Sequence, residues 1–139
     1  MSVDFLDTNV LVYSLDVAAT EKKLIAQQIV NNALSVQSAL ISYQVVQETL
    51  NTVKRKFATT VTDDDALVLL ERMLVPLMRV MPSAALYTDA LRISQRFKFS
   101  FYDSLIVAAA HNAGCKRLLT EDMQHGQVVD GLRIVNPFI

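Results

Sequence analysis

Short apolar runs alternate with longer amphipathic segments along the chain, and this alternation predicts strands connected by helices. Each predicted strand is a brief run of mainly apolar residues that ends at a polar or turn-forming residue. The first strand ends at Asp7, and a turn at Asp130-Gly131 precedes the last one. The predicted strands cover residues 3–7, 39–41, 77–81, 117–120 and 132–135.

The segments between these runs carry apolar residues at helical spacing, and most of them open with a hydroxyl side chain that can cap a helix. A loop at 16–20 precedes the first helix. Pro76 is expected to stop the third helix, and Gly114 is a natural left-handed residue at the end of the last one. The predicted helices cover about 20–34, 42–57, 62–75, 83–97 and 100–114, with caps at Thr20, Ser42, Thr62, Ser83 and Ser100.

Strands that alternate with helices indicate a mostly parallel sheet covered on both faces. The pattern therefore predicts a three-layer α/β/α fold around a central sheet of about five strands. A chain of 139 residues without repeats or a linker is expected to form a single domain over 1–139.

Composition narrows the classes of function and location. With a net charge of −1, any contact with nucleic acid must come from local basic patches. The apolar fraction of 52% suggests that some apolar surface serves a partner or a self-association interface. The single cysteine, Cys115, cannot form an internal disulfide. The chain has no signal-peptide pattern and no run near the ~18 apolar residues of a membrane span, so we expect a cytoplasmic protein.

Four carboxylates are expected to meet where the parallel strands end, at the edge where open α/β sheets bind ligands. Asp7 ends the first strand, Asp122 follows the fourth, and Asp103 lies in the first turn of the helix that descends to the fourth strand. Glu48 lies in the second turn of the helix after the second strand.

Each acid also has a purely structural interpretation. Asp103 follows Ser100 by three residues, as in a capping box, and Asp122 alone resembles a turn residue. Glu48 faces away from the apolar stripe of its helix, toward solvent or a wet cleft. Asp7 is hardest to explain this way, because the end of a core strand is a poor place for a lone charge. Crowded carboxylates repel one another unless a cation joins them, and Mg²⁺ takes such oxygen ligands.

The rest of the sequence excludes several other sites. Three glycines are too few for a Walker-type loop or a dinucleotide fingerprint, and no Cys/His cluster suggests zinc. His111 and His125 are isolated.

Four motifs in this order resemble the PIN domain, across essentially the whole chain: Asp7-Thr8-Asn9, Glu48 in an inner helix, Phe101-Tyr102-Asp103-Ser104 and Leu119-Thr120-Glu121-Asp122. The segment 121–126 is most similar to the VapC-type toxins of toxin–antitoxin pairs.

The resemblance implies an endoribonuclease that depends on Mg²⁺ or Mn²⁺ and leaves a 5′-phosphate and a 3′-hydroxyl. Asp7 and Asp103 are then primary metal ligands, Asp122 completes the site directly or through water, and Glu48 binds a second ion or positions the attacking water. Either Glu121 or Asp122 can reach the ion, and the motif favours Asp122. The residues implied to orient the ligands from behind are Thr8, Asn9, Ser104 and Thr120.

The resemblance also implies partners: an RNA substrate, a cognate antitoxin that alone contacts DNA, and a second copy in a homodimer. Basic residues that can guide RNA, each also explicable as ordinary surface charge, are Lys54, Arg55, Lys56, Arg92, Arg96, Lys98, Lys116 and Arg117.

Three other functions remain open at this stage. A haloacid-dehalogenase-like phosphatase also begins with an aspartate at a strand end, but it needs a second aspartate where this chain has Asn9. A receiver-like signalling domain that binds magnesium needs paired acids after the first strand and a later lysine. A catalytically silent binding module would keep the same acids without turnover.

Overall fold

Among the described residues, the sheet contains six strands, one more than the apolar pattern predicts. The computed structural model describes residues 2–139, so Met1, the first residue of the expected domain, lies outside it. Within these residues the strand order is β3-β2-β1-β4-β6-β5, and all neighbours run parallel except β5, which is antiparallel to β6. The strands are β1 (Asp4–Leu6), β2 (Ala39–Ser42), β3 (Met78–Val80), β4 (Arg117–Leu119), β5 (Val128–Val129) and β6 (Leu132–Val135).

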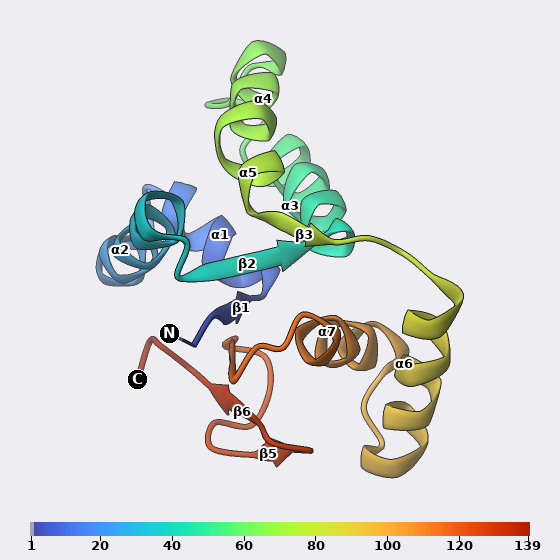
Figure 1. Ribbon diagram of the computed structural model, residues 1–139. Helices are drawn as coiled ribbons and strands as arrows, with labels where there is room; N and C mark the ends of the chain where they lie inside the picture. The colour runs from blue at the N-terminus through green and yellow to red at the C-terminus, as the bar shows by residue number, and fades with distance from the viewer. Residues whose placement is uncertain (1) are drawn as a thin grey trace.

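Helices connect the strands and cover the sheet, and Figure 1 shows α3 and α4 projecting from it as an arm. The helices α6 and α7 pack against each other, as do α1 and α2. The helical elements are α1 (Thr8–Leu15), α2 (Thr20–Val36), α3 (Tyr43–Lys56), α4 (Asp63–Leu69), the π-helical turn η1 (Leu70–Leu74), α5 (Val75–Leu77), α6 (Ala84–Phe97) and α7 (Phe101–Asn112).

Both faces of the central strands are buried. Phe5 and Leu6 of β1 are each 0% exposed, although consecutive strand residues point to opposite faces. Leu118 and Leu119 of β4, which pair with them in register, are buried as well. A sheet covered on both sides is what a mostly parallel topology requires. The predicted α/β fold with a parallel central sheet is confirmed.

The helix α1 is absent from the sequence prediction, because its residues Thr, Asn, Val, Tyr and Ser have modest helix propensity. Contacts with the rest of the fold stabilise this helix. The side chain of Asp7 caps the first turn, and Val10 and Leu11 are buried where α1 meets α2 and α3. The strand β5 is also absent from the prediction, because a run of two residues carries no readable period.

Pro76 does not stop the third predicted helix, contrary to the prediction. The helix continues from α4 through η1 into α5 and ends at Leu77. In the π-helical turn the N–H of Val75 bonds to the carbonyl of Leu70, five residues back. Pro76 follows this turn directly, at the start of α5, where the change in hydrogen-bond spacing accommodates a residue that has no N–H.

The predicted caps differ in outcome. The side chains at Thr62, Ser83 and Ser100 cap their helices as expected, and Thr62 forms a full capping box with Asp65. Thr20 is the first residue of α2, and the cap position is occupied by Ala19, so Thr20 does not cap the helix. Ser42 sits at the cap of α3, but its hydroxyl is buried and makes no bond among residues 2–139.

The register of β1 and β4 places their ends side by side. At the start of these strands Asp4 pairs with Arg117 through two hydrogen bonds of 3.0 and 2.6 Å. At the far end the N–H of Asp7 donates to the carbonyl of Leu119 at 3.0 Å. The residues after the two strands, Asp7 and Thr120, are therefore neighbours.

None of the helices within residues 2–139 is long and apolar enough to cross a membrane.

Truncating the fully buried Leu118 tests the central position of β4. We expect Leu118→Ala to lower the free energy of unfolding by about 2–5 kcal/mol, because it removes packed methyl groups and leaves a cavity. Urea denaturation measures the change. The matched control is Leu91→Ala, at a leucine that is 61% exposed, with an expected change within about 0.5 kcal/mol. Equal effects at the two positions would contradict the assignment of β4 to the core.

Candidate active site

Asp7 lies at the junction between the sheet and the first helix. It follows β1 and serves as the N-cap of α1, with Oδ1 accepting a hydrogen bond of 2.7 Å from the N–H of Thr8. The residue is only 7% exposed. The position that sequence analysis treated as a strand end is thus also a helix cap, and the helix N-terminus favours a negative charge there.

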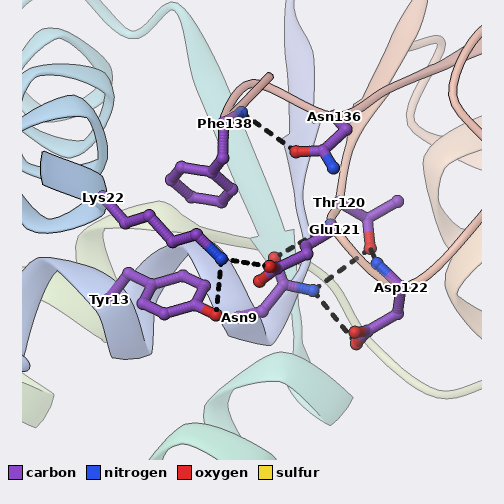
Figure 2. A network of polar contacts seen from close by, with 8 residues as sticks. All are labelled: Asn9, Tyr13, Lys22, Thr120, Glu121, Asp122, Asn136 and Phe138. Carbon is purple, nitrogen blue, oxygen red and sulfur yellow. Dashed lines mark hydrogen bonds and ion pairs between the residues drawn. The ribbon is translucent and has the colours of Figure 1, made fainter. Parts of the chain in front are cut away.

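Hydrogen bonds join the end of β1 to the loop after β4, as Figure 2 shows in part. Thr120 Oγ1 donates to Asp7 Oδ2 at 2.8 Å and accepts from the N–H of Asp122 at 3.1 Å. Asn9 Nδ2 donates to Thr120 Oγ1 and to Asp122 Oδ2, both at 3.1 Å. Asn9 Oδ1 accepts from the N–H of Glu121 at 3.2 Å. These bonds fix the position of the loop that carries Asp122.

The two adjacent acids of that loop have different surroundings. Glu121 forms an ion pair with Lys22 of α2, whose ammonium also donates to the Tyr13 hydroxyl at 3.3 Å (Figure 2). The ammonium lies 4.8 Å from the centre of the Tyr13 ring and 5.8 Å from that of Phe138. Burial raises the pKa of Glu121, but hydrogen bonds from Lys22 and Tyr13 outweigh it and bring the pKa below its usual value. Asp122, by contrast, accepts from a neutral amide.

Glu48 reaches the same region from α3. Its Oε1 accepts hydrogen bonds from Thr8 Oγ1 at 3.3 Å and from Gln44 Nε2 at 3.1 Å. Gln44 Nε2 also donates to the backbone carbonyl of Tyr102 at 3.3 Å. Gln44 therefore ties α3 to the start of α7, one helical turn before Glu48.

Asp103 lies in the first turn of α7. Its N–H donates to Ser100 Oγ at 3.1 Å, but the reciprocal bond of a capping box is not formed among residues 2–139. The structural interpretation of Asp103 thus explains its backbone, and burial raises the pKa of its carboxyl more than the side-chain hydrogen bond from Ser100 lowers it. Ser104, the next residue, is fully buried, and its hydroxyl has no hydrogen-bond partner within the described chain.

The four predicted acids line one cleft of about 340 Å³. They come from four separate segments: the ends of β1 and β4, the second turn of α3 and the first turn of α7. Lys56 also lines the cleft, but its ammonium is paired with Asp16 at 3.2 Å. The lining residues are Asp7, Thr8, Asn9, Val12, Tyr13, Gln44, Glu48, Thr52, Lys56, Tyr102, Asp103, Ile106, Glu121 and Asp122.

Burial and mutual repulsion raise the pKa of three acids in the cleft, Asp7, Glu48 and Asp103. Burial is the largest cause for Asp7 and outweighs the hydrogen bond from Thr120, so that its pKa rises to about 6. Burial also raises the pKa of Glu48, with smaller contributions from Asp103 and Asp122. The pKa of Asp103 is raised by burial and by Asp122. The cleft therefore holds negative charge that the protein itself does not neutralise.

The donor set fits a hard divalent cation. Within residues 2–139, no three His, Cys, Asp or Glu side chains lie close enough to form a closed ligand set. Mg²⁺ and Mn²⁺ do not need one, because they keep several waters and often take only one or two protein carboxylates. The available oxygens and the raised pKa values of Asp7, Glu48 and Asp103 suit such an ion, which would stabilise the ionised forms.

Comparison of the chain with known proteins identifies its family. The family model described as the PIN domain matches residues 5–130. The chain belongs to the PIN domain family. No curated protein sequence matches it at a significant level.

Two solved structures share the fold of this PIN domain. One is described as a toxin–antitoxin complex from Klebsiella pneumoniae, with a TM-score of 0.68 and 18% identity, covering 96% of this chain and 97% of the other. The second is VapC20 of Mycobacterium tuberculosis, described as a toxin that cleaves the sarcin–ricin loop. It has a TM-score of 0.63 and 17% identity, covering 86% of this chain and 89% of the other.

Three contributors to the site of the PIN domain are missing from the sequence prediction. Gln44 precedes Glu48 by one helical turn, so the shared helix face is a signal that the sequence does carry. Lys22 and Tyr13 bind Glu121 across long sequence separations, and nothing in the chain marks those partners.

Replacing Asp7 by Asn tests the burial of this carboxylate in the metal-free protein. The unfolded carboxyl ionises near 3.8 and the folded one near 6, so the native state binds more protons between these values. Stability is therefore lost as pH rises through this window. Above it, we expect Asp7→Asn to be more stable than the parent protein by on the order of 3 kcal/mol.

Urea unfolding in EDTA at a series of pH values measures the difference between the two proteins, which should shrink toward zero as pH falls below about 4. Asp130→Asn serves as a control because Asp130 lies in an exposed pair with Arg96, where ionisation is favoured by the folded state. A gap between Asp7→Asn and the parent that does not vary with pH would contradict the raised pKa.

Proposed function

We propose that this PIN domain is a metal-dependent endoribonuclease and the toxin of a type II toxin–antitoxin pair. The observation that carries the proposal is the convergence of Asp7, Glu48, Asp103 and Asp122 on one cleft. A cleft of uncompensated carboxylates suits a hydrolase that uses a divalent cation. The RNA substrate is inferred from family membership and from the neighbour described as a toxin that cleaves the sarcin–ricin loop.

Asp7 and Asp103 would hold the ion as primary ligands, and Asp122 would complete the site directly or through water. The hydrogen bonds of Asp122 favour it over Glu121, which is already paired with Lys22. A bound Mg²⁺ or Mn²⁺ would polarise the phosphodiester and acidify water. Glu48 is exposed to the cleft and has a raised pKa, so it is suited to accept a proton from the attacking water or to bind a second ion.

Residues behind the acids would keep them in place. Thr120 and Thr8 donate to Asp7 and Glu48, and Asn9 donates to Asp122, so each would orient a carboxylate. Ser104 would likewise orient Asp103, because Ser104 is buried and directly follows Asp103 in the chain. In-line attack by water would leave a 5′-phosphate and a 3′-hydroxyl.

The proposal includes two protein partners within the cytoplasm. One is a cognate antitoxin, through which alone the pair would contact DNA, and the other is a second copy of the chain. The neighbour described as a toxin–antitoxin complex supports the first. Large apolar side chains exposed on the helices offer surface for both, and include Leu24, Val36, Leu67, Val68, Val75 and Leu91.

Family membership argues against the phosphatase and receiver-like alternatives. In the position where the phosphatase needs an acid, Asn9 donates hydrogen bonds to Thr120 and Asp122 and thus supports the site instead. A catalytically silent binding module would retain this geometry and differ only in turnover.

Removing a proposed ligand should abolish cleavage. We expect Asp7→Asn and Asp103→Asn to lose more than about 100-fold in rate, since even residues behind a metal's ligands contribute 10–100-fold. The measurement is digestion of RNA with Mg²⁺ or Mn²⁺, with end mapping of the products and an EDTA control that should show no cleavage. Asp130→Asn should cleave like the parent. RNA cleavage by Asp7→Asn at the parent rate, or by the parent in EDTA, would refute the proposal.

The neighbouring acids Glu121 and Asp122 should differ in their effect on the metal. We expect Asp122→Asn to weaken Mn²⁺ binding by at least about tenfold, and Glu121→Gln to change it by less, because Glu121 is occupied by Lys22. Calorimetric titration of each folded variant with Mn²⁺ makes the comparison without relying on activity. A larger loss in Glu121→Gln would assign the ligand role to Glu121 instead.

A further inference from the structure

A second cleft adjoins the acidic one along α3. It has a volume of about 300 Å³ and is lined by Gln44, Gln47, Glu48, Asn51 and Tyr102. Three of these residues, Gln44, Glu48 and Tyr102, also line the acidic cleft, so the two hollows share a wall. A chain lying across the proposed catalytic acids would place its next unit in this second cleft, which we call the amide cleft.

The lining of the amide cleft is suited to the edges of an uncharged polar ring. Gln47 and Asn51 are exposed and lie one helical turn apart, so their amides point from the same face of α3. Each amide offers two N–H donors and one carbonyl acceptor. Glu48 is the one charged group in the lining, and it belongs equally to the acidic cleft.

Tyr102 gives the amide cleft an aromatic wall. It is 67% exposed, a large fraction for a tyrosine whose backbone is held in the first turn of a helix. Its carbonyl accepts from the buried Gln44 amide at 3.3 Å, and its ring packs edge-on against Phe101 with centroids 5.5 Å apart. The ring is thereby supported from behind, and much of its surface stays open for stacking.

Charge alone does not explain how this region would retain RNA. The acidic cleft repels phosphates, and its cation Lys56 is already paired with Asp16. Lys22, beside that cleft, is paired with Glu121. Three further basic side chains are engaged elsewhere, in the pairs Lys54–Asp63, Arg96–Asp130 and Arg117–Asp4, and none of the remaining basic residues within 2–139 lines either cleft. Unpaired bases, which stack on aromatic rings and present their edges to amides, offer the missing affinity.

We propose that the amide cleft binds one unpaired nucleobase of RNA next to the phosphodiester held at the acidic cleft. The ring of Tyr102 stacks on the base, and the amides of Gln47 and Asn51 contact its edge. The site thus selects single-stranded or looped RNA and contributes to the choice of base beside the cut. This inference rests on the proposed ribonuclease function, because the adjoining acids supply the reaction.

An RNA base suits this cleft better than a protein segment does. An amphipathic helix docks through apolar anchors in an apolar groove. Such a groove exists elsewhere, between α3 and α4, where Leu50, Ala66, Leu67 and Leu70 form most of the lining. The amide cleft has polar side chains and a single ring instead, and it continues directly into the acidic cleft.

Equilibrium binding to Asp7→Asn protein, in which RNA would stay intact, tests the proposal. The probe is a short unstructured RNA with 2-aminopurine at successive positions, whose fluorescence falls on stacking. We expect Tyr102→Leu, added to Asp7→Asn, to raise Kd about tenfold and to remove the fluorescence change at one position. Tyr102→Phe should retain both. Tyr87→Leu is the matched control at a tyrosine that is exposed but lines neither cleft.

The amides are tested by mapping cleavage sites on a mixed-sequence RNA with otherwise intact protein. We expect Gln47→Leu with Asn51→Leu to change the base preference next to the cut, and to raise KM more than it lowers kcat. Unchanged preference together with unchanged Kd in Tyr102→Leu would overturn the inference. A change of molecular mass in Tyr102→Leu, measured by light scattering, would also overturn it and assign the ring to an interface between two copies.

The outcomes separate this inference from the proposed function. Cleavage by the parent protein with no effect of Tyr102→Leu refutes the amide cleft alone. Binding that depends on Tyr102 without any cleavage by the parent refutes the ribonuclease and leaves a base-binding site. Absence of both binding and cleavage refutes both.

Discussion

The contact between Asp7 and Thr120 is the constraint on which the rest of the site depends. It exists because β1 and β4 are neighbours in register, so that the residues after them emerge side by side. The same Thr120 hydroxyl then accepts from Asn9 and from the backbone of Asp122. One buried carboxylate thus organises both the start of α1 and the loop after β4. Burying it raises its pKa to about 6, a cost that a purely structural cap would not require.

An acidic cleft is a poor binding site for a polyanion until its charge is balanced. Burial raises the pKa of Glu48 and of Asp103, and hydrogen bonds from Gln44, Thr8 and Ser100 do not offset it. The nearby cation Lys22 is paired with Glu121, so Glu121 has a structural role. Asp122 accepts a hydrogen bond from the neutral amide of Asn9. A divalent cation would correct the imbalance at the acids, and base contacts further along α3 would add affinity that depends less on charge.

The sequence predicted what local pattern can encode. Buried runs such as 3–7 and 117–120 gave the central strands, and parallel topology then brought Asp7 and Asp122 to one edge. It could not predict α1, whose residues favour a helix only after packing, or β5, which is too short to show a period. The rule that proline ends a helix failed at Pro76, because a π-helical turn ahead of it changed the bonding pattern. The Lys22–Glu121 pair joins residues whose proximity only the folded chain creates.

The helix α3 connects the two clefts because two interleaved pairs of its residues, on neighbouring faces, present different chemistry. Gln44 contacts Glu48 and the start of α7, and both residues line both clefts, whereas Gln47 and Asn51 line only the amide cleft. A helix holds these pairs at fixed spacing, so a base in one cleft and a phosphodiester in the other would lie in constant relation. Exposed amides beside a fixed set of acids can change without disturbing them, since surface substitutions cost little stability. Such an arrangement separates the choice of RNA from the chemistry of cutting it within a single helix.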